Sequence, residues 1–171
     1  GGATPAARTH DRTNMTAPPL SKPATHSVFG RVKSSYPRIL HLLVPLDFSG
    51  KSRQALRYAV PLAQKFSARI HLVHVLSPGR IADRANLPRL QAEALRRLDL
   101  MAAELLPPRL QSDNLVLIGE PARQILGAAS ELDADLIVLT TKDRSGFRRV
   151  LLGSTAERVI RLAPCPVMSI R

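Results

Sequence analysis

The sequence predicts an α/β fold: a single doubly wound, five-stranded parallel sheet with helices on both faces. Short runs of Leu, Ile and Val alternate with longer amphipathic segments, as in strands joined by crossover helices. Aromatic residues make up only 4% of the 171 residues, so the core must be aliphatic, as in buried parallel strands. A hydrophobic share of 44% is enough to fill one such core.

The first two predicted strands are separated in the sequence by one predicted helix. The near-continuous apolar run RILHLLVPL at 38–46 predicts a buried strand, and RIHLVHVL at 69–76 predicts the second. Between them, Ser49 can cap a helix over 51–66 whose Ala and Leu residues share one face. Pro61 lies inside that helix, and we expect it to kink or break the helix.

Three further helices and three further strands complete the pattern. Pro121 suits the first position of a helix, and Ser154 with Glu157 three residues later predicts a capping box. The predicted elements are a helix over 85–105, a strand over 114–118, a helix over 122–132, a strand over 135–140, a helix over 154–162 and a strand over 167–170.

Residues 1–35 differ from the rest of the chain. They show no apolar periodicity and hold five Lys or Arg and one Asp, so we predict a disordered basic tail before a domain over 36–171. The tail lacks the apolar segment of a secretory signal. Cys165 is the only cysteine, so no internal disulfide can form, which favours a reducing, cytoplasmic setting.

The net charge of +12 admits nucleic acid, an anionic ligand or an anionic surface as a partner. No basic motif is interleaved with aromatic side chains that could stack bases, so we do not expect nucleic acid. No apolar run approaches the roughly 20 residues that span a membrane, so we expect no membrane partner.

Ligands of doubly wound sheets bind beyond the carboxyl ends of the strands, where the strand order reverses. Asp47 follows the first strand, and the basic loop after 135–140 leads to the helix start at Gly153-Ser154. A helix N-terminus offers unpaired N–H groups and a positive dipole end, which favour an anion. Both segments are therefore candidates for a ligand-binding site.

The chain resembles the universal stress protein family over about 38–171. The resemblance rests on six fragments in the same order, namely VPLDFS, LVHVL, GEPA, ADLIVL, LLGSTAERVI and APCPV. It implies a Rossmann-like sheet, similar to the adenine nucleotide alpha hydrolase fold, with strand order 3-2-1-4-5. This order makes the first and fourth strands neighbours where the order reverses, so it implies that Asp47 and the loop from Thr140 to Gly153 face one crevice. It also implies a stress-response module, and a homodimer through the apolar edge strand at 167–170.

Some members of that family bind ATP, which implies a set of ligand-binding residues here. Pro45 and Asp47 would contact the nucleoside, and Val75 the adenine. The remaining implied residues follow the fourth strand and begin the last helix: Leu139, Thr140, Asp143, Gly153, Ser154 and Thr155.

Thr140 and Asp143 stand where ATP-binding members have glycine. A left-handed backbone costs an ordinary residue roughly 1–2 kcal/mol, and the Asp143 charge would repel phosphates. A total near 3 kcal/mol would weaken binding roughly a hundredfold. We therefore expect weak binding of a nucleotide or small anion, with ATP doubtful as a cofactor.

Other interpretations remain open at this point. Asp47 is equally suited to close a turn by bonding its own backbone, and Ser154 to cap its helix without a ligand. The sequence shows no catalytic constellation, and His71 and His74 must point to opposite faces of a strand, so no metal site is expected. A weak ATP-hydrolysing enzyme that uses Asp47 and Ser154, or a ligand-free interaction domain, are the alternatives.

Overall fold

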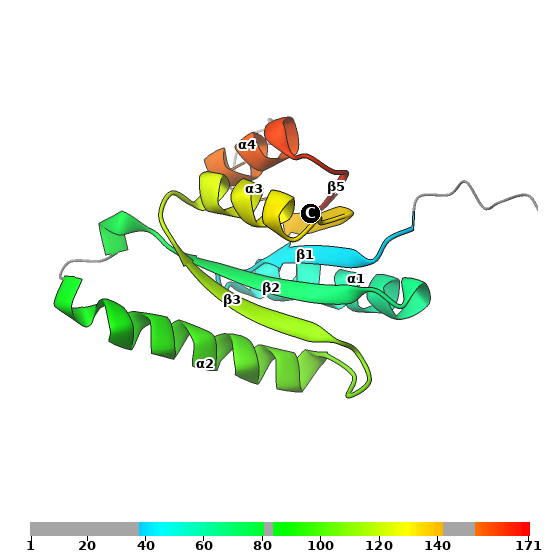
Figure 1. Ribbon diagram of the computed structural model, residues 1–171, viewed down its shortest axis with the longest axis horizontal. Helices are drawn as coiled ribbons and strands as arrows, with labels where there is room; N and C mark the ends of the chain where they lie inside the picture. The colour runs from blue at the N-terminus through cyan, green and yellow to red at the C-terminus, as the bar shows by residue number, and fades with distance from the viewer. Residues whose placement is uncertain (1–37, 81–83, 142–152) are drawn as a thin grey trace, which may run out of the picture. The chain divides into compact units, whose positions relative to one another are not determined.

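The computed structural model describes residues 38–80, 84–141 and 153–171. Its sheet is parallel and five-stranded, in the order β3-β2-β1-β4-β5, as predicted (Figure 1). The strands are β1 (His41–Pro45), β2 (Arg69–Leu76), β3 (Ser112–Ile118), β4 (Leu136–Thr140) and β5 (Val167–Ile170). The order reverses between β1 and β4, and β3 and β5 form the two edges.

Four α-helices cover the two faces of the sheet. They are α1 (Gly50–Phe66), α2 (Leu87–Leu105), α3 (Pro121–Glu131) and α4 (Ser154–Leu162). Figure 1 shows α3 and α4 on one side of the sheet and α2 on the other. Leu42, Val44 and Leu56 belong to the core beneath α1 and α2, whereas Leu43, Ile137 and Val159 belong to the core beneath α3 and α4.

The ends of β1 differ from the predicted strand over 38–46. The N–H groups of Leu40 and His41 both donate to Asp135 Oδ2, at 2.7 and 3.0 Å. The Asp135 side chain therefore satisfies both donors in place of a neighbouring strand, whereas the Leu40 carbonyl still accepts from the Arg69 N–H of β2 at 2.8 Å. At the other end, Leu46 is still anchored by its N–H to the Val73 carbonyl at 2.8 Å.

The predicted break at Pro61 is wrong, because α1 runs from Gly50 to Phe66 with Pro61 inside it. Pro61 is exposed, while Ala55, Leu56 and Ala63 on the opposite side are buried completely. Packing of that buried face stabilises the helix enough to offset the hydrogen bond that proline removes. No helix in the described part of the chain has the length and apolarity needed to cross a membrane.

Candidate functional site

A cavity of about 330 Å³ opens at the carboxyl ends of β1, β2 and β4 and beside the first turns of α3 and α4. Asp47 and Gly153 both line it, although more than a hundred positions separate them in the sequence. The expected crevice between these two segments is therefore present.

The cavity gathers nearly all of the residues that the sequence singled out. The predicted residues that line it are Pro45, Asp47, Val75, Leu139, Thr140, Gly153, Ser154 and Thr155. Asp143 lies outside the described residues. Their placement is thus observed, whereas their role in binding remains a prediction.

Sequence reasoning missed about half of the lining. The additional residues are Leu46, Ser52, Val73, His74, Ser77, Pro121, Ile125, Ala156 and Val159. Two of them could have been predicted from the sequence. Val73 shares a strand face with Val75, and Pro121 begins a helix at the carboxyl end of the strands. Ser52 and Ile125 could not be found without knowing how α1 and α3 pack.

Asp47 closes the turn between β1 and α1. Its Oδ1 accepts a hydrogen bond from the Ser49 N–H at 3.0 Å, and Ser49 Oγ accepts from the Ser52 N–H at 3.1 Å. The Asp47 side chain is nevertheless exposed at the cavity. The turn role of Asp47 is observed, and it leaves the carboxylate positioned to meet a ligand.

Phe48 holds the same turn in a strained conformation, with φ of 62°. This left-handed backbone costs a non-glycine residue about 1–2 kcal/mol. The Phe48 ring packs on the His74 ring, with 4.2 Å between centroids, and the Arg97 guanidinium lies 4.0 Å from its centroid. His74 Nδ1 lies 2.7 Å from the Leu46 carbonyl oxygen, so these contacts fix the β1 end against β2.

The two helix N-termini at the cavity differ in their caps. Glu120 caps α3, because its carboxylate accepts from the N–H groups of Ala122 at 3.1 Å and Arg123 at 2.9 Å. Glu120 Oε2 also lies 3.1 Å from Arg158 of α4. The backbone hydrogen bond from Arg123 is the main cause that lowers the pKa of Glu120, and the charge of Arg158 contributes.

At α4 the predicted Ser154–Glu157 capping box is wrong. The helix begins at Ser154, and its N-cap is Gly153, which provides no side-chain hydrogen bond. The Gly153 carbonyl accepts the first helical bond from the Glu157 N–H at 2.9 Å, which places Ser154 one position too late to cap. The α4 N-terminus therefore faces the cavity without a side-chain cap.

Backbone strain at Thr140, which was expected to weaken ligand binding, is also absent. Thr140 ends β4 and pairs with Ile170 of β5. The non-glycine residues with positive φ in the described chain are Phe48, Ser67 and Asp133, so Thr140 carries no left-handed strain. Its effect on a ligand would instead come from its side chain, which lines the cavity where glycine would leave room.

The described residues show no metal centre or activated thiol. They contain no group of three or more His, Cys, Asp or Glu side chains arranged to hold a metal ion. Cys165 is half-buried, and burial is the main cause that raises the pKa of its thiol, with the nearby Asp135 charge adding to the effect. This environment favours a packing role for Cys165 over reactivity.

Comparison with known proteins decides the family. The sequence profile of the universal stress protein family matches residues 39–171. The chain belongs to the universal stress protein family. It is 32% identical to universal stress protein MJ0531 of Methanocaldococcus jannaschii over 143 residues, which cover 76% of this chain and 81% of the relative.

Solved members of the family share this fold. A universal stress protein family member from Burkholderia pseudomallei is 30% identical, with a TM-score of 0.60 over 78% of this chain and 96% of its own. A universal stress protein in complex with cAMP has a TM-score of 0.61 at 23% identity, over 79% and 98% of the two chains. The universal stress protein from Archaeoglobus fulgidus in complex with dAMP has a TM-score of 0.57 at 24% identity, over 79% and 100%.

Proposed function

We propose that this universal stress protein is a cytoplasmic stress-response module that binds a nucleotide or a similar small anion weakly at the cavity between Asp47 and Gly153. The observation that carries the proposal is the meeting of an exposed carboxylate, an apolar wall and a helix N-terminus without a side-chain cap in one cavity. A nucleotide offers a complementary group to each of them.

The apolar wall suits the base. Val73 and Val75 of β2 and Ile125 of α3 line one part of the cavity, and the flat face of a purine can pack on such side chains. Asp47 lies at the end of β1, where its carboxylate can accept hydrogen bonds from ribose hydroxyls or an exocyclic amine. These contacts would give orientation and selectivity for a nucleoside.

The anion would lie at the start of α4. Ser154 and Thr155 line the cavity in the first turn, where backbone N–H groups lack intrahelical partners. A cavity of about 330 Å³ is at the lower end of the usual range for small-molecule sites. This size, with a Thr140 side chain in the wall, favours a monophosphate or cyclic phosphate over a triphosphate. The cAMP and dAMP complexes of the two solved relatives agree with that preference.

Calorimetric titration with AMP, cAMP and Mg-ATP tests the proposal. We expect micromolar or weaker affinity for the adenine monophosphates and no tighter binding of Mg-ATP. Adenosine and inorganic phosphate, titrated separately, show which half of the ligand carries the affinity. Sub-micromolar affinity for Mg-ATP would contradict the proposed size limit, and no heat with any nucleotide at millimolar concentration would contradict the site.

The same samples separate the alternative functions. Release of phosphate from labelled ATP would favour a weak ATP-hydrolysing enzyme, and an Asp47→Asn variant would show whether the carboxylate takes part. A melting temperature that no nucleotide raises would favour a ligand-free interaction domain, since a ligand that binds only the folded state must stabilise it.

We also infer a homodimer through β5. This strand is at the edge of the sheet and its side chains are mostly half-buried, which favours pairing with a second copy. Two apolar residues of α4, the helix that precedes β5 in the chain, are also exposed, namely Ile160 at 39% and Leu162 at 52%. Sedimentation should show a dimer at micromolar concentration and a monomer for Ile170→Lys. A wild-type monomer at high micromolar concentration would refute the interface.

A further inference from the structure

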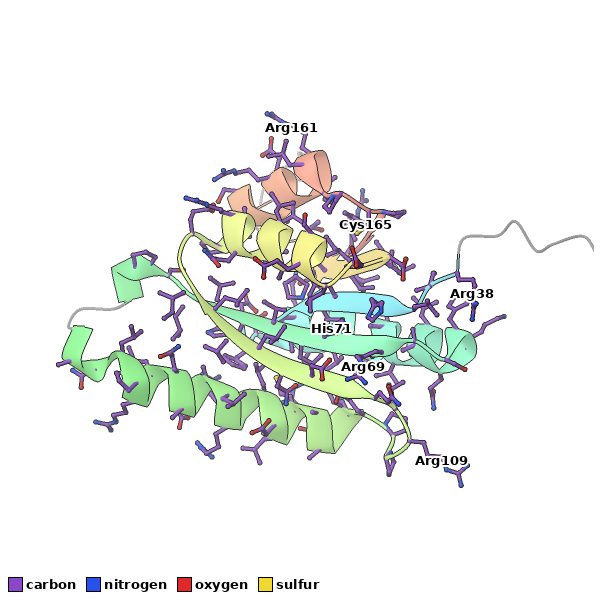
Figure 2. The ribbon with its side chains drawn as sticks, in the orientation of Figure 1. Arg38, Arg69, His71, Arg109, Arg161 and Cys165 are labelled. Atoms are coloured by element: carbon purple, nitrogen blue, oxygen red, sulfur yellow. The ribbon has the colours of Figure 1, made fainter. Side chains whose placement is uncertain are left out.

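Three ionisable side chains lie in a row on three adjacent strands, at the end of the sheet away from the cavity. His41 begins β1, His71 lies near the start of β2, and Asp113 of β3 is the register partner of His71. By strand alternation they share the sheet face of Leu43, Val73 and Leu115, which is the face that α3 covers. Figure 2 shows His71 and Arg69 on the same strand.

The two imidazole rings are joined directly. His41 Nδ1 lies 3.0 Å from His71 Nε2, in hydrogen-bond geometry. The ring centroids are 5.3 Å apart and the ring planes differ by 20°, so the rings meet at their edges. Because one nitrogen must donate and the other accept, this link contains one proton.

Asp113 determines the direction of the link. Its Oδ2 lies 3.1 Å from His71 Nδ1, and Arg69 donates to both carboxylate oxygens at 2.9 and 3.1 Å. No described acceptor aligns with His71 Nδ1 in full hydrogen-bond geometry, so its contact with Asp113 is mainly electrostatic. A proton on Nδ1 is favoured beside the carboxylate. His71 Nε2 is then the acceptor, and His41 Nδ1 is the donor.

The two histidines differ in their access to solvent. His71 is only 3% exposed, and burial is the main cause that lowers its pKa, with the Asp113 charge opposing and the charges of His41 and Arg69 adding to the effect. His41 is half-buried, so protons can reach its ring from solvent. A further charge lies on the β4 side of His41, where the Asp135 carboxylate accepts hydrogen bonds from the N–H groups of Leu40 and His41.

We propose that His41, His71 and Asp113 form a relay that holds a single proton between its rings and makes the join of β1 to β2 sensitive to acid. The first added proton goes from solvent to His41 Nε2 and leaves the link intact. A second would have to go to His71 Nε2, where its N–H would oppose the N–H of His41. The second proton therefore binds only when the rings separate, which is a local opening between β1 and β2 at the end of the sheet remote from the ligand cavity.

Ring NMR of the full-length, isotope-labelled protein between pH 4.5 and 8 tests this order. We expect the pair to take up its protons in two steps, the second at the buried His71 ring and at the lower pH, because burial and the N–H of His41 both disfavour the His71 cation. The nitrogen shifts should also show Nδ1–H on both neutral rings. Two rings that titrate together, or His71 before His41, would overturn the proposal.

The variant His41→Gln separates the relay from simple burial. A glutamine amide can donate to neutral His71 and can turn its oxygen toward the protonated ring, which a histidine cation cannot do. We therefore expect His71 to take up its proton about one pH unit higher in the variant. An unchanged His71 titration would mean that burial alone controls the ring and would overturn the relay.

Urea unfolding of the same two proteins gives an independent readout. The folded protein keeps the His71 ring neutral at a pH where the unfolded chain charges it, so its folding constant should fall as the pH drops below about 6.5, by up to about tenfold for each unit by which the pKa of His71 is lowered. The fall should be shallower in His41→Gln. Should this variant not fold, the wild-type titration order decides the question on its own. A wild-type folding constant that does not change between pH 6.5 and 5 would contradict the proposal.

Discussion

Two consecutive residues at the end of β1 determine the mouth of the cavity. Asp47 closes the turn through the Ser49 N–H, and Phe48 takes up the strained backbone that this turn requires. Neither residue acts alone, since the Phe48 ring is held between His74 and Arg97. The position of the carboxylate therefore depends on the packing of its neighbour.

Asp47→Asn should separate the ligand role from the turn role. The amide keeps an oxygen for the Ser49 N–H, so the turn persists, while the charge is lost. If the carboxylate accepts from nucleoside hydroxyls, affinity for AMP should fall about tenfold, the effect of a lost charge-assisted hydrogen bond. Calorimetry and thermal unfolding measure the two effects, with Asp133→Asn at the exposed α3–β4 turn as the matched control. Unchanged affinity would leave Asp47 as a turn residue only.

The strained backbone at Phe48 predicts that a glycine variant at this position is more stable than an alanine variant. Phe48→Ala removes the ring contacts and keeps the left-handed penalty. Phe48→Gly removes one more carbon and relieves the strain, so it should be more stable than Phe48→Ala by about 0.5–1 kcal/mol, after allowing for the greater backbone freedom of unfolded glycine. Urea unfolding of the three proteins gives the comparison. A glycine variant less stable than the alanine variant would show that the turn relaxes in the absence of the ring.

At the scale of elements, α3 and α4 both direct their N-termini at the cavity, but only α3 has a side-chain cap. Glu120 provides α3 with a charged cap, whereas Gly153 leaves α4 without one. The sequence indicated both helices and their approximate starts. It could not show which residue of Gly153-Ser154 caps α4, because the two choices differ by one position and both leave a polar side chain near the helix start.

The α3 cap predicts a pH dependence of stability. The pKa of Glu120 is lowered in the folded state, first by the Arg123 N–H and then by the Ala122 N–H and nearby arginines. The folded pKa is below the unfolded value of about 4.3, so the stabilisation is present above that pH and is lost as the pH falls through the folded value.

Glu120→Gln should therefore lower the melting temperature at pH 7 and have little effect near pH 3. Thermal unfolding of the wild type and the variant at both values measures the difference, with Glu131→Gln at the far end of α3 as the control. An equal loss at both values would mean that the charge of Glu120 is irrelevant to the cap.

A side-chain cap added to α4 should raise the stability of the protein and lower its affinity for the ligand. Gly153→Asp supplies an acceptor for the free N–H groups, so we expect a gain of a few tenths of a kcal/mol in stability. The same carboxylate would occupy the anion position and repel a phosphate, so AMP affinity should fall by tenfold or more.

The neutral cap Gly153→Asn provides the comparison for that experiment. It satisfies the same N–H groups without a charge, so it should retain more affinity than the aspartate. Calorimetry with AMP measures both variants. Equal affinity in the wild type and Gly153→Asp would place the ligand's anion away from α4.

At the scale of the whole domain, the apolar runs predicted every strand of the described sheet, and β2 and β5 have the predicted bounds. The resemblance supplied the strand order and placed Asp47 and Gly153 in one cavity. Contacts that depend on register between strands could not be predicted. The His41–His71 link joins β1 to β2, and the Phe48–His74 contact joins the turn after β1 to β2. The two-residue periodicity of a strand does not specify which strand it pairs with, or in which register.

The corrections have a common physical origin. Pro61 was expected to kink or break α1 because local preference disfavours it, yet a buried apolar face keeps the helix continuous. Thr140 was expected to carry backbone strain because relatives have glycine there, yet pairing with β5 keeps it in the strand. In both cases tertiary packing outweighs the local signal.

The most direct measurement is the affinity of the wild-type domain for AMP and Mg-ATP, titrated side by side and repeated with Gly153→Asp. Micromolar or weaker binding of AMP, no tighter binding of Mg-ATP, and a loss of AMP binding in the variant are the predicted results. Sub-micromolar Mg-ATP binding, or nucleotide binding that Gly153→Asp leaves unchanged, would contradict a site that pairs the end of β1 with the start of α4.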